Sequence, residues 1–138
     1  MPTRKGPPHD QRAEWLDRLP RARNLRVQQR AELADAVDTL PADAFVLCLT
    51  QGHKTDRPIL HRALATRDFP FVGVIGSDSK AAILRREVIA AGLTAGRAKK
   101  FHCPIGLAFG TNHPHEIALS IAAQLLTERD RLARPNSS

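Results

Sequence analysis

The chain has 138 residues, of which 42% are hydrophobic, and a formal net charge of +7 at pH 7. This length suits one domain with a hydrophobic core. No apolar run approaches a membrane span, and the polar amino terminus lacks the apolar stretch of a signal peptide. The two cysteines, Cys48 and Cys103, stand in apolar contexts and form no disulfide framework, so we expect a cytoplasmic protein without membrane contact.

The positive charge is concentrated at the amino terminus. The first thirty residues hold eight Arg or Lys and three acidic residues, which gives +5 and leaves only +2 for the other 108. Aromatic residues make up 4% of the chain, too few for the stacking platforms of a nucleic-acid surface. We therefore expect a disordered basic arm over residues 1–12 and no nucleic-acid partner.

The first predicted elements are short. Residues 13–17 suggest a strand, and the alternation around Leu25 and Val27 suggests a second. The pattern of 31–40 predicts a helix that Pro41 ends. The unbroken apolar run at 45–49 predicts a buried parallel strand, followed by a loop at 50–57 and a helix over 58–67 with Pro58 in its first turn.

Residues 71–93 predict a strand, a tight glycine turn and a helix. The strand ends at Gly76, and Ser77 with Asp78 provides N-cap residues. A helix follows, and its apolar face consists of Ala81, Leu84, Val88 and Ala91 at helical spacing. Gly92 stands where a left-handed C-cap would end this helix, and Leu93 can fold back on it. The turn, at the positive end of the helix dipole and near Lys80, suits a phosphate or carboxylate, although a plain, well-capped connection has the same pattern.

The last third begins with a basic stretch and an irregular segment. Residues 101–113 are too rich in Gly, Pro and His for a regular element, and we expect positive φ at Gly106 and Gly110. Ile105 and Leu107 are expected to pack beneath this segment. Pro114 then starts a long helix, before a loose tail at 134–138. The predicted buried face of this helix consists of Ile117, Ile121, Leu125 and Leu132.

Alternating strands and helices predict an α/β fold with a doubly wound parallel sheet. Ligands of such sheets bind beyond the carboxyl ends of the strands. Three segments converge there, at residues 50–56, 76–80 and 103–110. Their convergence predicts a binding site.

The chemistry of these segments leaves alternatives. The spacings of His102 with Cys103, and of His113 with His115, are not zinc signatures, so we expect no metal site. Cys103 is either a half-buried thiol or a nucleophile with His102 or His53 as its base. No GxGxxG fingerprint is present.

Three stretches together resemble one family. They are TQGHKTD (50–56), FVGVIGSDSKAAILRREVIAAGL (71–93) and HCPIGLAFGTNHPHEIALSIAAQLL (102–126). They are similar to the carboxyl-terminal Rossmann-like domain of the xanthine dehydrogenase accessory proteins, XdhC, over about residues 15–132. In the first loop Thr50, His53 and Asp56 match the family, whereas Gln51 and Gly52 replace a histidine and an aspartate.

The resemblance implies a chaperone without turnover of its own. Such proteins bind the molybdenum cofactor, protect it during sulfuration and insert it into apo-xanthine dehydrogenase of purine catabolism, with a cysteine desulfurase as a further partner. NAD(P) is not expected. The cofactor-binding residues implied for this chain are Thr50, His53, Asp56, Gly76, Ser77, Lys80, Cys103, Ile105 and Gly106.

The chain also departs from the family's length. The family's domain begins upstream with a strand and a glycine-rich turn, so we expect a Rossmann-like parallel sheet flanked by helices that lacks this first strand. Residues 13–133 would be a partial domain, either the carboxyl-terminal part of a longer protein or a shortened relative. Self-association or an upstream XdhC portion is then expected. The alternatives are a nucleotide-binding oxidoreductase-like domain and a truncated remnant without activity.

Overall fold

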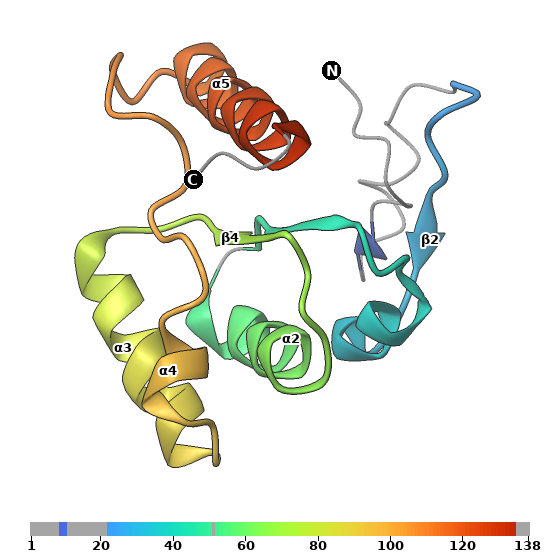
Figure 1. Ribbon diagram of the computed structural model, residues 1–138, viewed down its shortest axis with the longest axis vertical. Helices are drawn as coiled ribbons and strands as arrows, with labels where there is room; N and C mark the ends of the chain where they lie inside the picture. Colours follow the sequence, from blue (N-terminus) through green and yellow to red (C-terminus); the bar gives the residue numbers. More distant parts are fainter. Residues whose placement is uncertain (1–8, 11–21, 51, 135–138) are drawn as a thin grey trace.

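The computed structural model describes residues 9–10, 22–50 and 52–134 (Figure 1). Short strands alternate with helices, as the sequence predicts. The strands are β1 (His9–Asp10), β2 (Gln28–Gln29), β3 (Phe45–Cys48) and β4 (Phe71–Val74). The helices are the 3-10 helix η1 (Leu33–Thr39) and the α-helices α2 (His53–Thr66), α3 (Asp78–Ala90), α4 (Ala95–Ala98) and α5 (Pro114–Ala133).

β3 and β4 form the parallel centre of the fold, in a register that places Phe45 opposite Phe71. His102 extends this sheet on the far side of β4. It donates its backbone N–H to the carbonyl of Val72 and accepts from the N–H of Val74, both at 2.9 Å. The segment predicted to be irregular therefore contributes a third, single-residue strand position. β1 and β2 form a separate parallel pair.

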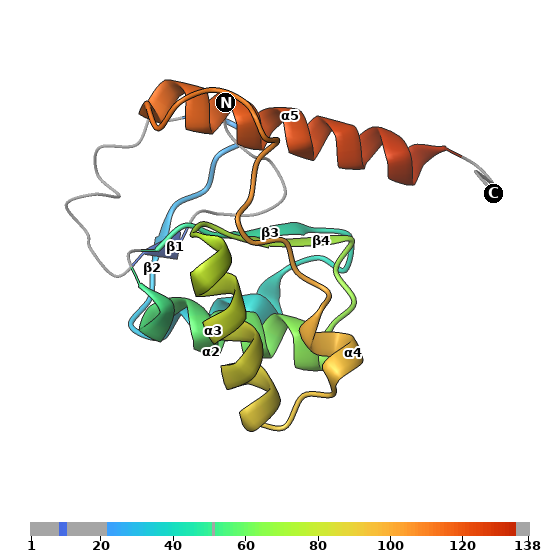
Figure 2. The same ribbon diagram turned by 90° about the vertical axis from the view of Figure 1, so that its left-hand side faces the viewer.

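Helices cover the sheet unequally on its two sides. Figure 2 shows α2, α3 and α4 together on one side of β3 and β4, and α5 on the other. The core lies between the sheet and the helix group, because alternate strand residues point there. Its strand members are Val46, Cys48, Val72 and Val74. The fold is thus a Rossmann-like parallel sheet flanked by helices.

The opposite face of the sheet carries aromatic side chains. The Phe71 ring stacks on the His102 imidazole at 4.5 Å and lies 5.6 Å from the Phe45 ring. Ile105 closes over Gly73, where an added Cβ would collide with the Ile105 side chain. Gly73 therefore lets the loop after the third strand position approach the sheet closely.

The predicted ends of α3 are confirmed. The Ser77 side chain accepts the backbone N–H of Lys80 at the amino end. At the carboxyl end Gly92 has a φ of +114°, and Leu93 folds back to donate its N–H to Val88. This is the glycine C-cap that the sequence indicates.

The start of α2 was predicted wrongly. The helix begins at His53, and Gly52 accepts the N–H groups of both Thr55 and Asp56. Pro58 therefore lies inside the helix, near enough to its start that the missing donor removes one bond without ending it.

Smaller differences occur before β3. The predicted helix over 31–40 is a 3-10 helix over 33–39. The predicted strand around Leu25 and Val27 is displaced to β2, while Leu25 forms an isolated bridge with Ala22. The predicted strand at 13–17 lies outside the described residues.

α5 is less buried than the sequence predicts. Ser120 is its one buried residue, and the side chain of Leu132, predicted to be buried, is 46% exposed. The helix rests on the preceding loop, where Leu107 donates its N–H to the Ser120 carbonyl at 3.1 Å. Leu107 itself is 40% exposed, contrary to the prediction. Neither α5 nor any other helix in the described ranges has the length and hydropathy of a membrane span.

Candidate functional site

The carboxyl ends of the parallel strands bring the three predicted segments together. The backbone N–H of Ile75 donates to the Cys48 carbonyl at 3.0 Å, which joins the ends of β3 and β4. The Cys103 sulfur lies 3.8 Å from the carbonyl of Ser77. A cluster formed by Thr50, Asp56 and Lys80 connects the end of β3, the start of α2 and the start of α3.

Asp56 is the centre of this cluster. It is fully buried, at 0% exposure. Its Oδ2 lies 2.7 Å from the Lys80 ammonium, and its Oδ1 accepts the Thr50 hydroxyl at 2.5 Å. Because a buried charge without partners is very unfavourable, these two contacts are what permit a carboxylate at this position.

Lys80 reaches Asp56 across the glycine turn. Its Nζ also donates to the Ile75 carbonyl at 2.6 Å, and its side chain is 18% exposed. A Cβ at Gly76 would collide with the Lys80 side chain, so this turn needs glycine for the close approach. The sequence suggested that Lys80 attracts an anion, whereas in the structure much of its charge is balanced by Asp56.

The first turn of α3 borders the cluster. The Ser77 hydroxyl oxygen accepts the Lys80 N–H at 3.2 Å, which leaves its own proton to donate. Asp78 is exposed and is the first residue of the helix. Its carboxylate competes for the same helix dipole that would attract a bound anion.

Both cysteines are near this cluster and remain protonated at neutral pH. Burial raises the pKa of the Cys48 thiol to about 12, and the Asp56 charge acts in the same direction. Burial also raises the pKa of Cys103, with Lys80 opposing the rise. Composition and context suggested that Cys48 is a core residue, and nothing in the sequence indicated that it borders Asp56.

His102 is not arranged as a base for Cys103. Its ring stacks on Phe71, on the sheet face away from α2. Cys103, the next residue, packs against the core cluster on the other face. With a raised thiol pKa and its neighbouring histidine on the opposite face, Cys103 has the features of a packing residue.

The remaining predicted site residues have other positions. His53 is the first residue of α2, and its side chain is outside the described part. Ile105 covers the sheet at Gly73. Gly106, with a φ of +102°, donates its N–H to the Gln124 side chain at 2.7 Å. Ile105 and Gly106 thus position α5 and the loop above the sheet.

Possible metal ligands do not gather in the described ranges. No group of three or more His, Cys, Asp or Glu side chains there could hold an ion. The stacked rings of His113 and His115 lie at the start of α5, where His113 accepts the backbone N–H of His115 as the helix cap. In this arrangement the His113 side chain caps the helix, and the His115 ring stacks on it.

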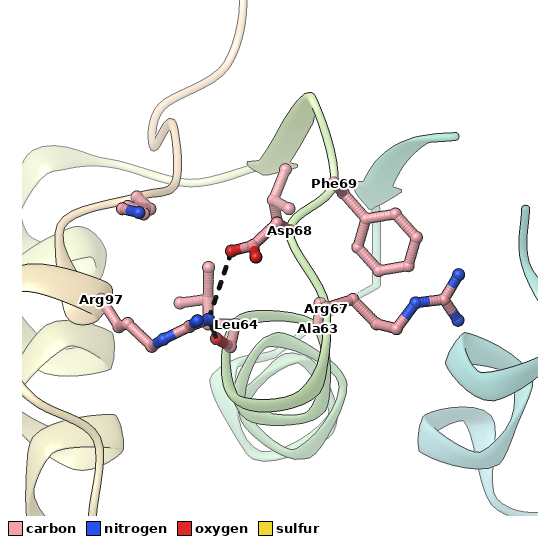
Figure 3. Close-up of a pocket in the computed structure, with 8 residues that line it drawn as sticks. Ala63, Leu64, Arg67, Asp68, Phe69 and Arg97 are labelled. Atoms are coloured by element: carbon pink, nitrogen blue, oxygen red, sulfur yellow. Dashed lines mark hydrogen bonds and ion pairs between the residues drawn. The ribbon is translucent and has the colours of Figure 1, made fainter. Parts of the chain in front are cut away.

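A second polar region lies at the opposite end of the sheet, around a pocket of about 120 Å³ (Figure 3). Arg97 donates to the Leu64 carbonyl at 2.6 Å and lies 3.4 Å from an Asp68 oxygen. Arg67 also lines the pocket, and its guanidinium lies over the Phe69 ring and donates to the Leu40 carbonyl at 2.8 Å. Both arginines donate to carbonyls at helix ends, which lack a partner within the helix. Helix capping therefore explains why these basic side chains gather around the pocket.

Comparisons with known proteins identify the family and the fold that this chain resembles. The model of a family described as the XdhC Rossmann domain matches residues 8–125. The uncharacterized protein YqeB of Escherichia coli K12 is 28% identical over 102 residues, which is 74% of this chain and 18% of that protein.

A solved structure is also similar. A crystal structure described as a xanthine dehydrogenase from Bacillus halodurans superposes with a TM-score of 0.69 and 27% identity. The match covers 94% of this chain but 36% of that one. The chain therefore spans about a third of this solved relative and under a fifth of YqeB.

Proposed function

The chain belongs to the XdhC Rossmann domain family, and from this premise we propose that it is an accessory protein for a molybdenum enzyme. In this role it binds the molybdenum cofactor, protects it during sulfuration and delivers it to apo-xanthine dehydrogenase, without catalysing a reaction itself.

The observation that carries the proposal is the polar cluster at the carboxyl edge of the sheet. Ligands of open parallel sheets bind at this edge. The donors there suit a phosphate-bearing pterin: the Ser77 hydroxyl, the backbone N–H groups that begin α3, and the one Lys80 proton left after its bonds to Asp56 and Ile75. When bound, the cofactor would supply the redox and sulfur chemistry of its metal.

The chain's own residues support binding rather than turnover. Asp56 is occupied on both oxygens and fully buried, so it is poorly placed to move a proton. Raised pKa values keep Cys48 and Cys103 as neutral thiols. Holding and orienting a ligand is the chemistry that remains for this set.

Direct titration tests the ligand class. The purified chain is titrated with molybdopterin and, separately, with NAD, at low and high salt. We expect pterin binding that weakens as salt rises, because charge contributes to it, and much weaker binding of NAD. Tight NAD binding with no measurable pterin binding would favour an oxidoreductase-like domain instead.

A second experiment tests the role of Cys103 in delivery. Apo-xanthine dehydrogenase is reconstituted with cofactor-loaded wild type, Cys103→Ala and the matched core variant Cys48→Ala. We expect full recovery of activity with Cys103→Ala and a modest fall in melting temperature, because the side chain packs against the core. Complete loss of transfer at an unchanged melting temperature would assign Cys103 a chemical role.

A further inference from the structure

The Lys80 side chain folds back over the glycine turn between β4 and α3. Its Nζ donates to the Ile75 carbonyl at 2.6 Å and lies 2.7 Å from Oδ2 of Asp56. On the way to these partners the methylene stem crosses Gly76: a Cβ built there would collide with Lys80 Cδ and would lie 3.1 Å from Cγ. The lysine stem therefore fills the space above the turn that glycine leaves free.

The lysine is fixed at both ends of its side chain. The backbone N–H of Lys80 donates to the Ser77 hydroxyl oxygen at 3.2 Å within the first turn of α3. The ammonium is held by Asp56, which is fully buried and also accepts the Thr50 hydroxyl. Hydrogen bonds between charged groups are strong, and only 18% of the Lys80 side chain is exposed. The covering of Gly76 is thus a stable feature of the turn.

Glycine turns at the carboxyl edge of a parallel sheet bind the pyrophosphate bridge of dinucleotides in many proteins. Glycine is needed there because the backbone must approach the bridge closely. In this chain the lysine stem occupies the position of that close approach. A terminal phosphate does not need this space, since it can bind the Ser77 hydroxyl and the N–H groups that begin α3. The two kinds of phosphate therefore meet different conditions at this turn.

We propose that Lys80, positioned by Asp56, is a specificity-determining residue that closes the Gly76 turn to pyrophosphate-bridged ligands and leaves it open to a terminal phosphate. This inference rests on the proposed function, which assigns a phosphate-bearing pterin to the same edge of the sheet. The exclusion acts through volume, because the stem lies where the bridge would lie. The ammonium adds little attraction for a second phosphate, because the Asp56 carboxylate balances its charge.

Two double variants of equal charge test the role of the stem. Asp56→Asn with Lys80→Met removes both charges and keeps an unbranched stem over Gly76, whereas Asp56→Asn with Lys80→Ala removes both charges and the stem. Asparagine retains an oxygen that can accept the Thr50 hydroxyl. Wild type and both variants are titrated with inorganic phosphate and with inorganic pyrophosphate at low salt, and circular dichroism confirms that each is folded.

The readout is the ratio of pyrophosphate affinity to phosphate affinity, because a general attraction for anions raises both. This ratio should be the same in wild type and in the variant with methionine. It should rise about fivefold in the variant with alanine, because the start of α3 then attracts the bridge over an open turn. In amide NMR spectra, pyrophosphate should shift the Gly76 resonance in the alanine variant alone.

An equal rise of the ratio in both double variants would show that charge, and not the stem, excludes pyrophosphate. An unchanged ratio in the alanine variant, or no binding of either anion, would show that the turn is not a phosphate site. Each of these results overturns the inference, and the same pair built on Asp56→Leu gives the comparison if an asparagine variant does not fold. The proposed function fails separately: a wild type that binds no molybdopterin would reject it, even where alanine raises the ratio.

Discussion

The two ends of the central sheet use similar groups in different environments. At the carboxyl end Lys80 lies 2.7 Å from Asp56, and the two side chains are 18% and 0% exposed. At the amino end Arg97 lies 3.4 Å from Asp68, and the exposed fractions are 38% and 76%. Both cations also donate to a backbone carbonyl.

The difference in burial separates a structural cap from a candidate site. An exposed ion pair is screened by water and contributes little to stability. A buried pair is fixed in place, because either partner alone would be left as an uncompensated charge. The number of basic residues is thus a poor guide to a candidate site, whereas one buried carboxylate at the carboxyl edge of the sheet is informative.

The largest expected effect is at Lys80. Lys80→Met leaves Asp56 buried without its counter-charge, and we expect it to lower the free energy of unfolding by about 3 kcal/mol. Denaturant unfolding measures this value. The double variant Asp56→Leu with Lys80→Met should recover part of the loss, and strict additivity of the two single variants would show that the side chains are not coupled.

Thr50→Val should have the next largest effect. The substitution keeps the side-chain shape and removes the hydroxyl that donates to Asp56. We expect a loss of about 2 kcal/mol, because a buried carboxylate oxygen loses its donor. The same denaturant experiment on Thr66→Val, whose hydroxyl bonds an exposed helix carbonyl, is the control and should show a much smaller change.

Alkaline pH should lower the free energy of unfolding through Cys48, which lies at the carboxyl end of β3. Burial raises the pKa of the Cys48 thiol to about 12 in the folded chain, whereas in the unfolded chain the pKa has its ordinary value of 9.0. The unfolded state therefore loses its proton first, and the free energy of unfolding falls as pH rises above 9, by about 1 kcal/mol at pH 10. Cys48→Ala should flatten this part of the pH profile, and an identical slope would contradict the assignment.

The smallest effect is expected at the amino end. Arg97→Met removes the exposed pair with Asp68 and the bond to the Leu64 carbonyl. We expect a loss of about 0.5 kcal/mol that high salt reduces further. A loss as large as that of Lys80→Met would show that burial does not distinguish the two ends.

Local patterns predict much of the fold. The apolar runs of β3 and β4, the Ser77 cap and the Gly92 stop are encoded within a few residues, and the structure confirms them. The start of α2 is missed because proline usually marks a first turn, while here Gly52 begins the helix earlier. The strand position at His102 is missed because one residue shows no periodicity.

The candidate site is less predictable than the fold. The sequence indicates which segments converge, but the Asp56–Lys80 pair spans 24 residues and depends on how α2 and α3 pack together. For the same reason the burial of Asp56 has no local signal. The exposure of Leu132 depends on α5 resting on a loop, which its helical periodicity cannot reveal.

The most direct test compares cofactor affinity in two charge variants, one at each end of the sheet. Asp78→Asn removes an exposed carboxylate at the start of α3, and Asp68→Asn removes one at the amino end. If the phosphate-bearing cofactor binds at the carboxyl edge, Asp78→Asn should tighten molybdopterin binding by about threefold at low salt, and Asp68→Asn should leave it unchanged. If Asp68→Asn tightened molybdopterin binding and Asp78→Asn left the affinity unchanged, the result would contradict this account.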